Sequence, residues 1–382
     1  MALTLLGYVE GVNPMQKDAR AVRIRDGHDN FFTPLRLVFA VLVMLGHAFV
    51  IALRDASQEP QVFFHYTFSY LAVNLFFVAS GFLVTKSMLY RGDGAGFAAA
   101  RILRIFPALA LHVAVVLLIV GPLATSLPLL DYFTHPDTLM QPLWVLTFFE
   151  TNMSLPGIFE TNAEQYGSVP LWTLRFEVLC YIGTLAAFAL GLLRRKWMVL
   201  AQFVVPSVLW IVGQSFGLLD DLPGTILNLL RFGIAYGLGA TIFAYSERLQ
   251  FTWAALPVLL GACWLLSATP VIEVTMNLLM AWLVMFVAYA RVPKLGGLQT
   301  LDDVSYGIYI YHWAVMQLVF YWLPELSVWS LFGLALPVTV AIAWASWIYV
   351  EKPMLTKKTA FAAWLRRGRA PRDYNRDAVL LD

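Results

Sequence analysis

Apolar residues in this chain are gathered in long, nearly continuous blocks that are separated by shorter polar segments. A helix needs about 20 apolar residues to cross a bilayer, and only helices and closed barrels satisfy their backbone groups there. Ten blocks approach or exceed that length, near residues 34–53, 66–89, 103–123, 171–193, 197–217, 223–245, 251–268, 271–290, 304–323 and 327–350. The pattern predicts an all-α, polytopic integral membrane protein with about ten transmembrane helices.

Composition supports this class. Hydrophobic residues make up 60% of the 382-residue chain and charged residues only 13%, and the mean hydropathy is +0.70. A soluble domain carries about twice that charge. The two cysteines, Cys180 and Cys263, fall inside apolar blocks and lack the spacing of metal ligands, so we expect neither a structural disulfide nor a metal site.

The distribution of basic residues predicts the orientation, because cytoplasmic segments of membrane proteins carry the excess of Lys and Arg. With both termini placed in the cytoplasm, all of the 26 Lys and Arg residues except Arg54, Arg175 and Arg231 fall on cytoplasmic segments. The predicted outer loops carry acidic residues instead: Asp131, Asp137, Glu150, Glu160, Glu164, Asp220 and Asp221. We therefore expect both the N- and the C-terminus to be cytoplasmic.

This arrangement divides the chain into three parts. Residues 1–30 form a cytoplasmic N-terminal arm, residues 31–356 form the transmembrane domain, and residues 357–382 form a basic cytoplasmic tail suited to anionic lipid. One connection is long, from about residue 124 to residue 170, and faces outward. Long loops of this kind are either lids and binding loops or ordered caps, and the sequence leaves both open.

The first apolar block contains two ionisable residues, which are energetically costly to bury in a membrane. His47 follows Arg36 by eleven positions, so the two share one helix face at a separation of roughly 16 Å. Ionisable groups inside a membrane segment are functional candidates by default. Imidazole can take and return a proton near neutral pH, as a general base must. The alternative is a histidine that only hydrogen-bonds a neighbouring helix.

A pair of arginines lies at the cytoplasmic end of the third block. Arg101 and Arg104 are three residues apart and share one face of a helix. Guanidinium groups bind phosphates in a planar, forked geometry, so the pair suits a phosphate clamp. A cytoplasmic anchor for the helix is the alternative.

Further polar residues lie inside the later blocks. Glu177, near Trp172 at the start of the fourth block, is expected to orient or charge-balance His47, or to hold two helices together. Ser305, Tyr309 and His312 follow an i, i+4, i+7 pattern and so share a face. Arg231 lies in the middle of the sixth block, and Glu177, Glu273 or a substrate anion are its candidate partners.

Taken together, in their order and spacing, these residues resemble the membrane-bound acyltransferase 3 family over roughly residues 30–353. The motifs are Arg36-x10-His47, the Phe-Phe-x-x-Ser-Gly-Phe run at Phe76 to Phe82, Arg101-x-x-Arg104, Trp172-Thr-Leu-x-x-Glu177, Ser305-Tyr-x-x-Tyr-x-x-His312 and Glu351-Lys352-Pro353. The Ser-Gly pair also permits close helix packing. Asn74 departs from the pattern, because the family often has an acidic residue there.

The resemblance implies transfer of an acyl group, usually acetyl, from acyl-CoA to a hydroxyl of an extracytoplasmic or lipid-linked glycan, such as exopolysaccharide or O-antigen, in a bacterial cytoplasmic (inner) membrane. His47 would be the catalytic base, with Glu177 beside it. Arg36, Arg101 and Arg104 would bind acetyl-CoA without a metal. The expected substrate-binding residues are Trp172, Arg231, Ser305, Tyr309 and His312. The partners it implies are acyl-CoA, the glycan and membrane lipid, with no nucleic acid, and a homo-oligomer is compatible with it.

Two other functions compete with an acyltransferase. A transporter or flippase of lipid-linked saccharide would use the buried histidines and arginines as a proton or substrate path, but we find no inverted repeat with matching broken helices. A scaffold in an envelope assembly would explain the orientation and leave His47 and His312 without a role.

Overall fold

The computed structural model describes residues 21–24 and 30–366. Each of the ten predicted blocks overlaps a helix: α1 Phe32–Ala52, α2 Phe68–Arg91, α3 Gly94–Val115, α7 Leu174–Ala189, α8 Lys196–Ser215, α9 Gly224–Ala244, α10 Ala255–Leu265, α11 Ile272–Ala288, α12 Ser305–Trp322 and α13 Val328–Ser346. Among the described residues, seven helical segments are long and apolar enough to span a membrane, and α10 and α11 are shorter apolar helices. The predicted all-helical architecture is confirmed in the main, and it is compatible with a polytopic membrane protein. Ten crossings and cytoplasmic termini stay predictions.

Two helices continue through π-helical turns. α3 runs on through η3, Val116–Val120, into α4, Gly121–Ala124, and α13 runs on through η7, Trp347–Glu351, into α14, Lys352–Thr356. α3 also begins nine residues before the predicted block, because the Asp93 carboxylate caps it by accepting the Gly96 amide at 2.7 Å. π-helical turns within α-helices frequently occur at functional sites. The side chain of Glu351 in η7 is buried.

The remaining regular structure is short. β1, Ala21–Arg23, pairs antiparallel with β4, Gln250–Thr252, and β2, Gln61–Phe63, pairs with β3, Tyr66–Thr67. The 3-10 helices are η2 Ala56–Gln58, η4 Pro170–Thr173, η5 Leu192–Arg194 and η6 Pro293–Thr300. Cys180 and Cys263 are both free.

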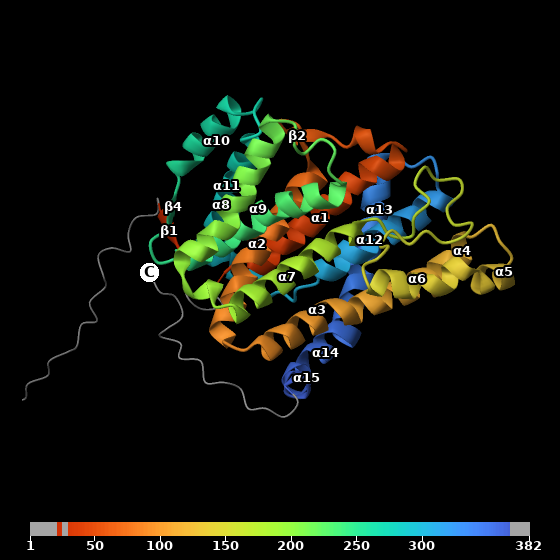
Figure 1. The fold of residues 1–382 in the computed structure, drawn as a ribbon. Helices are drawn as coiled ribbons and strands as arrows, with labels where there is room; N and C mark the ends of the chain where they lie inside the picture. Colours follow the sequence, from red (N-terminus) through yellow and green to blue (C-terminus); the bar gives the residue numbers. More distant parts are fainter. Residues whose placement is uncertain (1–20, 25–29, 367–382) are drawn as a thin grey trace, which may run out of the picture.

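The core forms where α2 packs against α9, with α1 beside α2 and α12 beside α1 (Figure 1). A Cβ added at Gly81 would collide with the backbone of Tyr236, and one added at Gly239 would collide with the backbone of Val78. The backbones of α2 and α9 therefore approach as closely as the Ser-Gly pair predicts. In Figure 1, α3 runs along one edge of the bundle and α10 lies at the opposite edge.

The long predicted loop is partly helical. It contains α5, Leu129–Thr134, and α6, Pro136–Leu146, and Tyr132 is buried with its hydroxyl donating to the Leu117 carbonyl at 2.9 Å. A strap, residues 161–168, is attached to α12. Gln317 donates to the Glu164 carbonyl at 2.7 Å, and the Trp313 indole donates to the Tyr166 carbonyl at 2.9 Å. The strap is thus held against the middle of α12, where His312 lies.

The predicted basic tail begins as a packed helix. α15, Lys358–Leu365, packs against the start of α3, where Arg366 forms an ion pair with Asp93. The hydrogen bond from Arg366 holds the pKa of Asp93 below its usual range. Most of the predicted N-terminal arm and the tail from residue 367 lie outside the described residues.

Candidate active site

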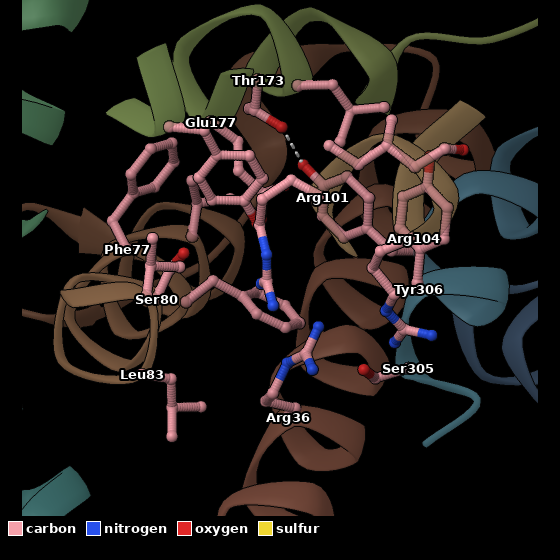
Figure 2. Close-up of a pocket in the computed structure, with 17 residues that line it drawn as sticks. Arg36, Phe77, Ser80, Leu83, Arg101, Arg104, Thr173, Glu177, Ser305 and Tyr306 are labelled. Carbon is pink, nitrogen blue, oxygen red and sulfur yellow. Dashed lines mark hydrogen bonds between the residues drawn. The ribbon is translucent and has the colours of Figure 1, made fainter. Parts of the chain in front are cut away.

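A pocket lies between α1, α2, α3, α7 and α12 and holds about 840 Å³ of empty space, including the part that is open to the surroundings (Figure 2). Six of the ten predicted site residues line it: Arg36, Arg101, Arg104, Glu177, Ser305 and Tyr309. The structure therefore gathers residues from five helices around one cavity. Of the other predicted site residues, His47 and His312 lie beyond one end of it, and Trp172 and Arg231 lie outside its lining.

Two of the pocket arginines are already neutralised. Arg104 donates to Asp303 at 2.9 Å and to Glu351 at 3.0 Å, and Arg36 forms an ion pair with the same Asp303 oxygen. Burial alone would raise the pKa of Asp303, but the charges of Arg36 and Arg104 outweigh it and hold the pKa below its ordinary value. Arg104 therefore pairs with two carboxylates, whereas the sequence predicted that it binds phosphate.

Arg101 is the pocket cation that has no acidic partner among the described residues. Its guanidinium lies over the rings of Phe97 and Tyr181, with the carbon 5.9 and 5.6 Å from their centroids, and its buried Nε has no hydrogen-bond partner. Figure 2 shows the Arg101 side chain extending into the pocket. A buried donor without a partner is costly and suits a site that an anionic ligand completes.

Glu177 does not contact His47, contrary to the prediction. Its carboxylate accepts the hydroxyl of Tyr181, one turn later on α7, and both side chains line the pocket. The reason is the packing order. α12, and not α7, lies beside α1 at the level of His47. The proposed catalytic role of Glu177 therefore has no support from a contact with the histidine.

The partner of His47 is His312. The Nδ1 of His47 lies 2.8 Å from the Nε2 of His312, and the two rings lie end to end and nearly coplanar, with planes at 15° and centroids 5.1 Å apart. His312 is fully buried, whereas the His47 ring is only partly buried. Trp313 makes a T-shaped contact with His47, with ring centroids 5.1 Å apart and the planes at 88°.

The histidine pair adjoins the far end of the pocket. Tyr309, which lines that end, shares a hydrogen bond with Thr173 at 2.5 Å, and its ring centroid is 6.2 Å from that of His312. Tyr309 and His312 are three residues apart on α12, about 4.5 Å along the helix axis. The shared face that was predicted for Ser305, Tyr309 and His312 thus runs from the arginines to His47.

Arg231 belongs to a separate buried network. Its Nε donates to Asn74 at 3.0 Å and its guanidinium lies 3.3 Å from the centroid of Tyr70. Glu273 accepts hydrogen bonds from Tyr70 at 2.7 Å and from Asn74 at 3.1 Å, so Asn74 links the two charges. Asn74, the position at which the family pattern is broken, is thus a structural bridge. Arg231 does not line the pocket, where a substrate contact was expected.

Trp172 likewise packs away from the pocket. Its ring lies 5.8 Å, centroid to centroid, from both Phe176 and Phe232, and the neighbouring Thr173 lines the cavity instead.

Asp303 is a site residue that the sequence motifs did not predict. The signal was present, because Asp302-Asp303 is an acidic pair directly before an apolar block on a predicted cytoplasmic side.

Comparisons with known proteins identify the family of this chain. The acyltransferase 3 family, described as an acyltransferase domain, matches residues 30–348. The chain is 30% identical to nodulation protein 10 of Rhizobium leguminosarum bv. viciae over 366 residues, covering 88% of this chain and 96% of that protein. It is 28% identical to an O-acetyl transferase of Shigella phage Sf6 over 335 residues, covering 86% of this chain and 97% of that protein. No solved structure matches. The chain belongs to the membrane-bound acyltransferase 3 family.

Proposed function

We propose that this protein is a membrane O-acetyltransferase that moves the acetyl group of cytoplasmic acetyl-CoA to a hydroxyl of an extracytoplasmic or lipid-linked glycan. Its family and the O-acetyl transferase relative support the acyl chemistry. The observation that carries the proposal is the placement of a histidine pair beyond one end of a pocket whose lining holds three arginines. A long, thin thioester with phosphates at one end fits such a site.

Each pocket residue then has a role that its contacts favour. Arg101, which lacks an acidic partner among the described residues, would bind a phosphate of the donor, with Arg36 held nearby by its ion pair with Asp303. Arg104 would hold the walls of the pocket together through Asp303 and Glu351. The apolar middle of the pocket, which includes Val73, Phe76 and Phe77, suits the pantetheine arm.

The transfer itself needs one proton to move. His47 would take the proton of the acceptor hydroxyl as its oxygen bonds to the thioester carbonyl carbon. The carbon–sulfur bond then breaks, and the proton is returned to the departing CoA sulfur. The Tyr309–Thr173 hydrogen bond lies between the pocket and the histidine pair, so the donor must reach His47 past these two side chains.

The acceptor would approach from the opposite side. The His47 ring is partly exposed, and its neighbour Trp313 is bonded to the strap at Tyr166. Because the strap belongs to the predicted outer loop, this placement favours an extracytoplasmic acceptor.

Glycan mass spectrometry tests the proposal in cells. A strain that lacks the gene should lose acetyl groups from one surface or exported glycan, and plasmid-borne wild-type protein should restore them while His47→Asn should not. Unchanged glycan acetylation in the deletion strain, together with lost export of unmodified saccharide, would contradict the proposal and favour the transporter.

A further inference from the structure

The contacts of the two histidines define where their protons lie. The Nδ1 of His312 is 3.0 Å from the carbonyl oxygen of Ile308, one turn earlier on α12, and its Nε2 is 2.8 Å from the Nδ1 of His47. A carbonyl oxygen only accepts hydrogen bonds, so the Nδ1 of His312 must carry its proton.

The second assignment follows from the first. A neutral imidazole carries one N–H, so the Nε2 of His312 holds a lone pair and accepts. The Nδ1 of His47 must then be the donor, which leaves the Nε2 of His47 without a proton. Both rings are taken as neutral, because a charge without an acidic partner is costly inside an apolar segment.

We propose that His312 is a positioning residue that fixes the proton of His47 on Nδ1 and so makes the Nε2 of His47 the base. This rests on the proposed function, in which His47 takes the acceptor proton. No described residue hydrogen-bonds the Nε2 of His47, and this nitrogen is not fully buried. The basic nitrogen is therefore available on the partly exposed side of the ring.

The pair also prepares for the charge that the reaction creates. When Nε2 takes a proton, His47 becomes an imidazolium whose Nδ1–H already points at a lone pair of His312. A hydrogen bond from a charged donor is roughly twice as strong as a neutral one. The edge contact with Trp313 restrains the same ring from turning. Orientation of a base by a third group is the general logic of nucleophile–base pairs.

Two amide substitutions at His312 separate its two hydrogen bonds. In His312→Gln, the side-chain oxygen can take the place of Nε2 and accept from His47. In His312→Asn, the amide nitrogen can take the place of Nδ1 and donate to Ile308, but nothing accepts from His47. His112→Leu is the matched control, because His112 is also fully buried and neither of its ring nitrogens has a hydrogen-bond partner.

The first readout is the 15N spectrum of histidine-labelled wild-type protein in lipid bilayers, assigned with His47→Asn. We expect a protonated Nδ1 and an unprotonated Nε2 for His47. The opposite tautomer would overturn the inference, whether or not the protein transfers acetyl groups.

The second readout is acetyl transfer. His312→Asn should lower kcat about 100-fold with little change in the KM for acetyl-CoA, because a base in the wrong tautomer loses the roughly 100- to 10,000-fold that general-base catalysis contributes. His312→Gln should recover most of kcat, and His112→Leu should keep it. A His312→Asn protein with wild-type kcat would overturn the inference and leave the proposed function intact, whereas a wild type without any transfer would overturn the function alone.

Discussion

Arg104 of α3 donates to Glu351 of η7 at 3.0 Å, and the side chain of Glu351 is fully buried. The residue that sequence motifs present as half of a phosphate clamp is therefore the only basic partner of a buried carboxylate among the described residues. Its neighbour Arg101 has no acidic partner in that part of the chain. The two arginines of one motif are expected to fail in different ways when they are replaced.

Arg104→Met should destabilise the protein, since removing one partner of a buried ion pair leaves the other charge uncompensated, at about 3 kcal/mol or more. Thermal unfolding in detergent measures this. The double variant Arg104→Met with Glu351→Leu should recover much of the loss. If the single variant unfolds at the wild-type temperature, the structural role of Arg104 is wrong.

Arg101→Gln should fold normally and bind the donor weakly. One charge-assisted hydrogen bond to phosphate contributes about 1.5–3 kcal/mol, so we expect the KM for acetyl-CoA to rise at least about tenfold with kcat less affected. Arg91→Gln, an exposed cation on a predicted cytoplasmic segment, is the control for charge removal. Equal KM values for the two variants would remove Arg101 from the donor site.

The contact between α15 and α3 should depend on pH. Because Arg366 lowers the pKa of Asp93, the ion pair contributes stability above the ordinary aspartate pKa of about 4 and loses it as pH falls through the lowered value. Proteolysis of the C-terminal segment between pH 6 and pH 3, with an acid-stable protease, should show α15 released at the acid end. Asp93→Asn should be cleaved readily throughout. A wild type whose cleavage does not change with pH would contradict this.

The close approach of α2 and α9 predicts unequal tolerance of glycine substitutions. Gly81→Ala places a Cβ against the Tyr236 backbone, whereas Gly183→Ala on α7 meets no atom within 4 Å. The first variant should lower the unfolding temperature and the second should not, because overpacking costs about 1–3 kcal/mol. Matching unfolding temperatures in the two variants would mean that the helices are further apart.

The sequence predicts features that depend on neighbouring residues better than contacts between residues that are far apart in the chain. The helices follow from apolar runs, and the face shared by Ser305, Tyr309 and His312 follows from helix periodicity. α3 begins before the predicted block because residues 94–100 are mostly Gly and Ala, although Asp93 is a recognisable cap. The Glu177–Tyr181 bond is an i, i+4 contact that local reasoning could have found.

Contacts between distant helices could not be predicted in the same way. His47 and His312 are 265 residues apart, and no local pattern says that α12 and not α7 packs beside α1 at that level. The same holds for Asp303, whose carboxylate meets Arg36 and Arg104 from two different helices. Tertiary packing decides which buried charges pair. The family motifs name the residues but do not say which of them are in contact.

The central claim is that His47 is the base of an acetyl transfer. The most direct measurement is transfer of radiolabelled acetyl from acetyl-CoA to glycan acceptor by the protein in lipid bilayers, comparing wild type with His47→Asn at equal folded amounts. The account predicts labelled glycan with wild type and a rate at least about 100-fold lower with the variant, the usual minimum loss of a general base. Equal rates from the two proteins would contradict it.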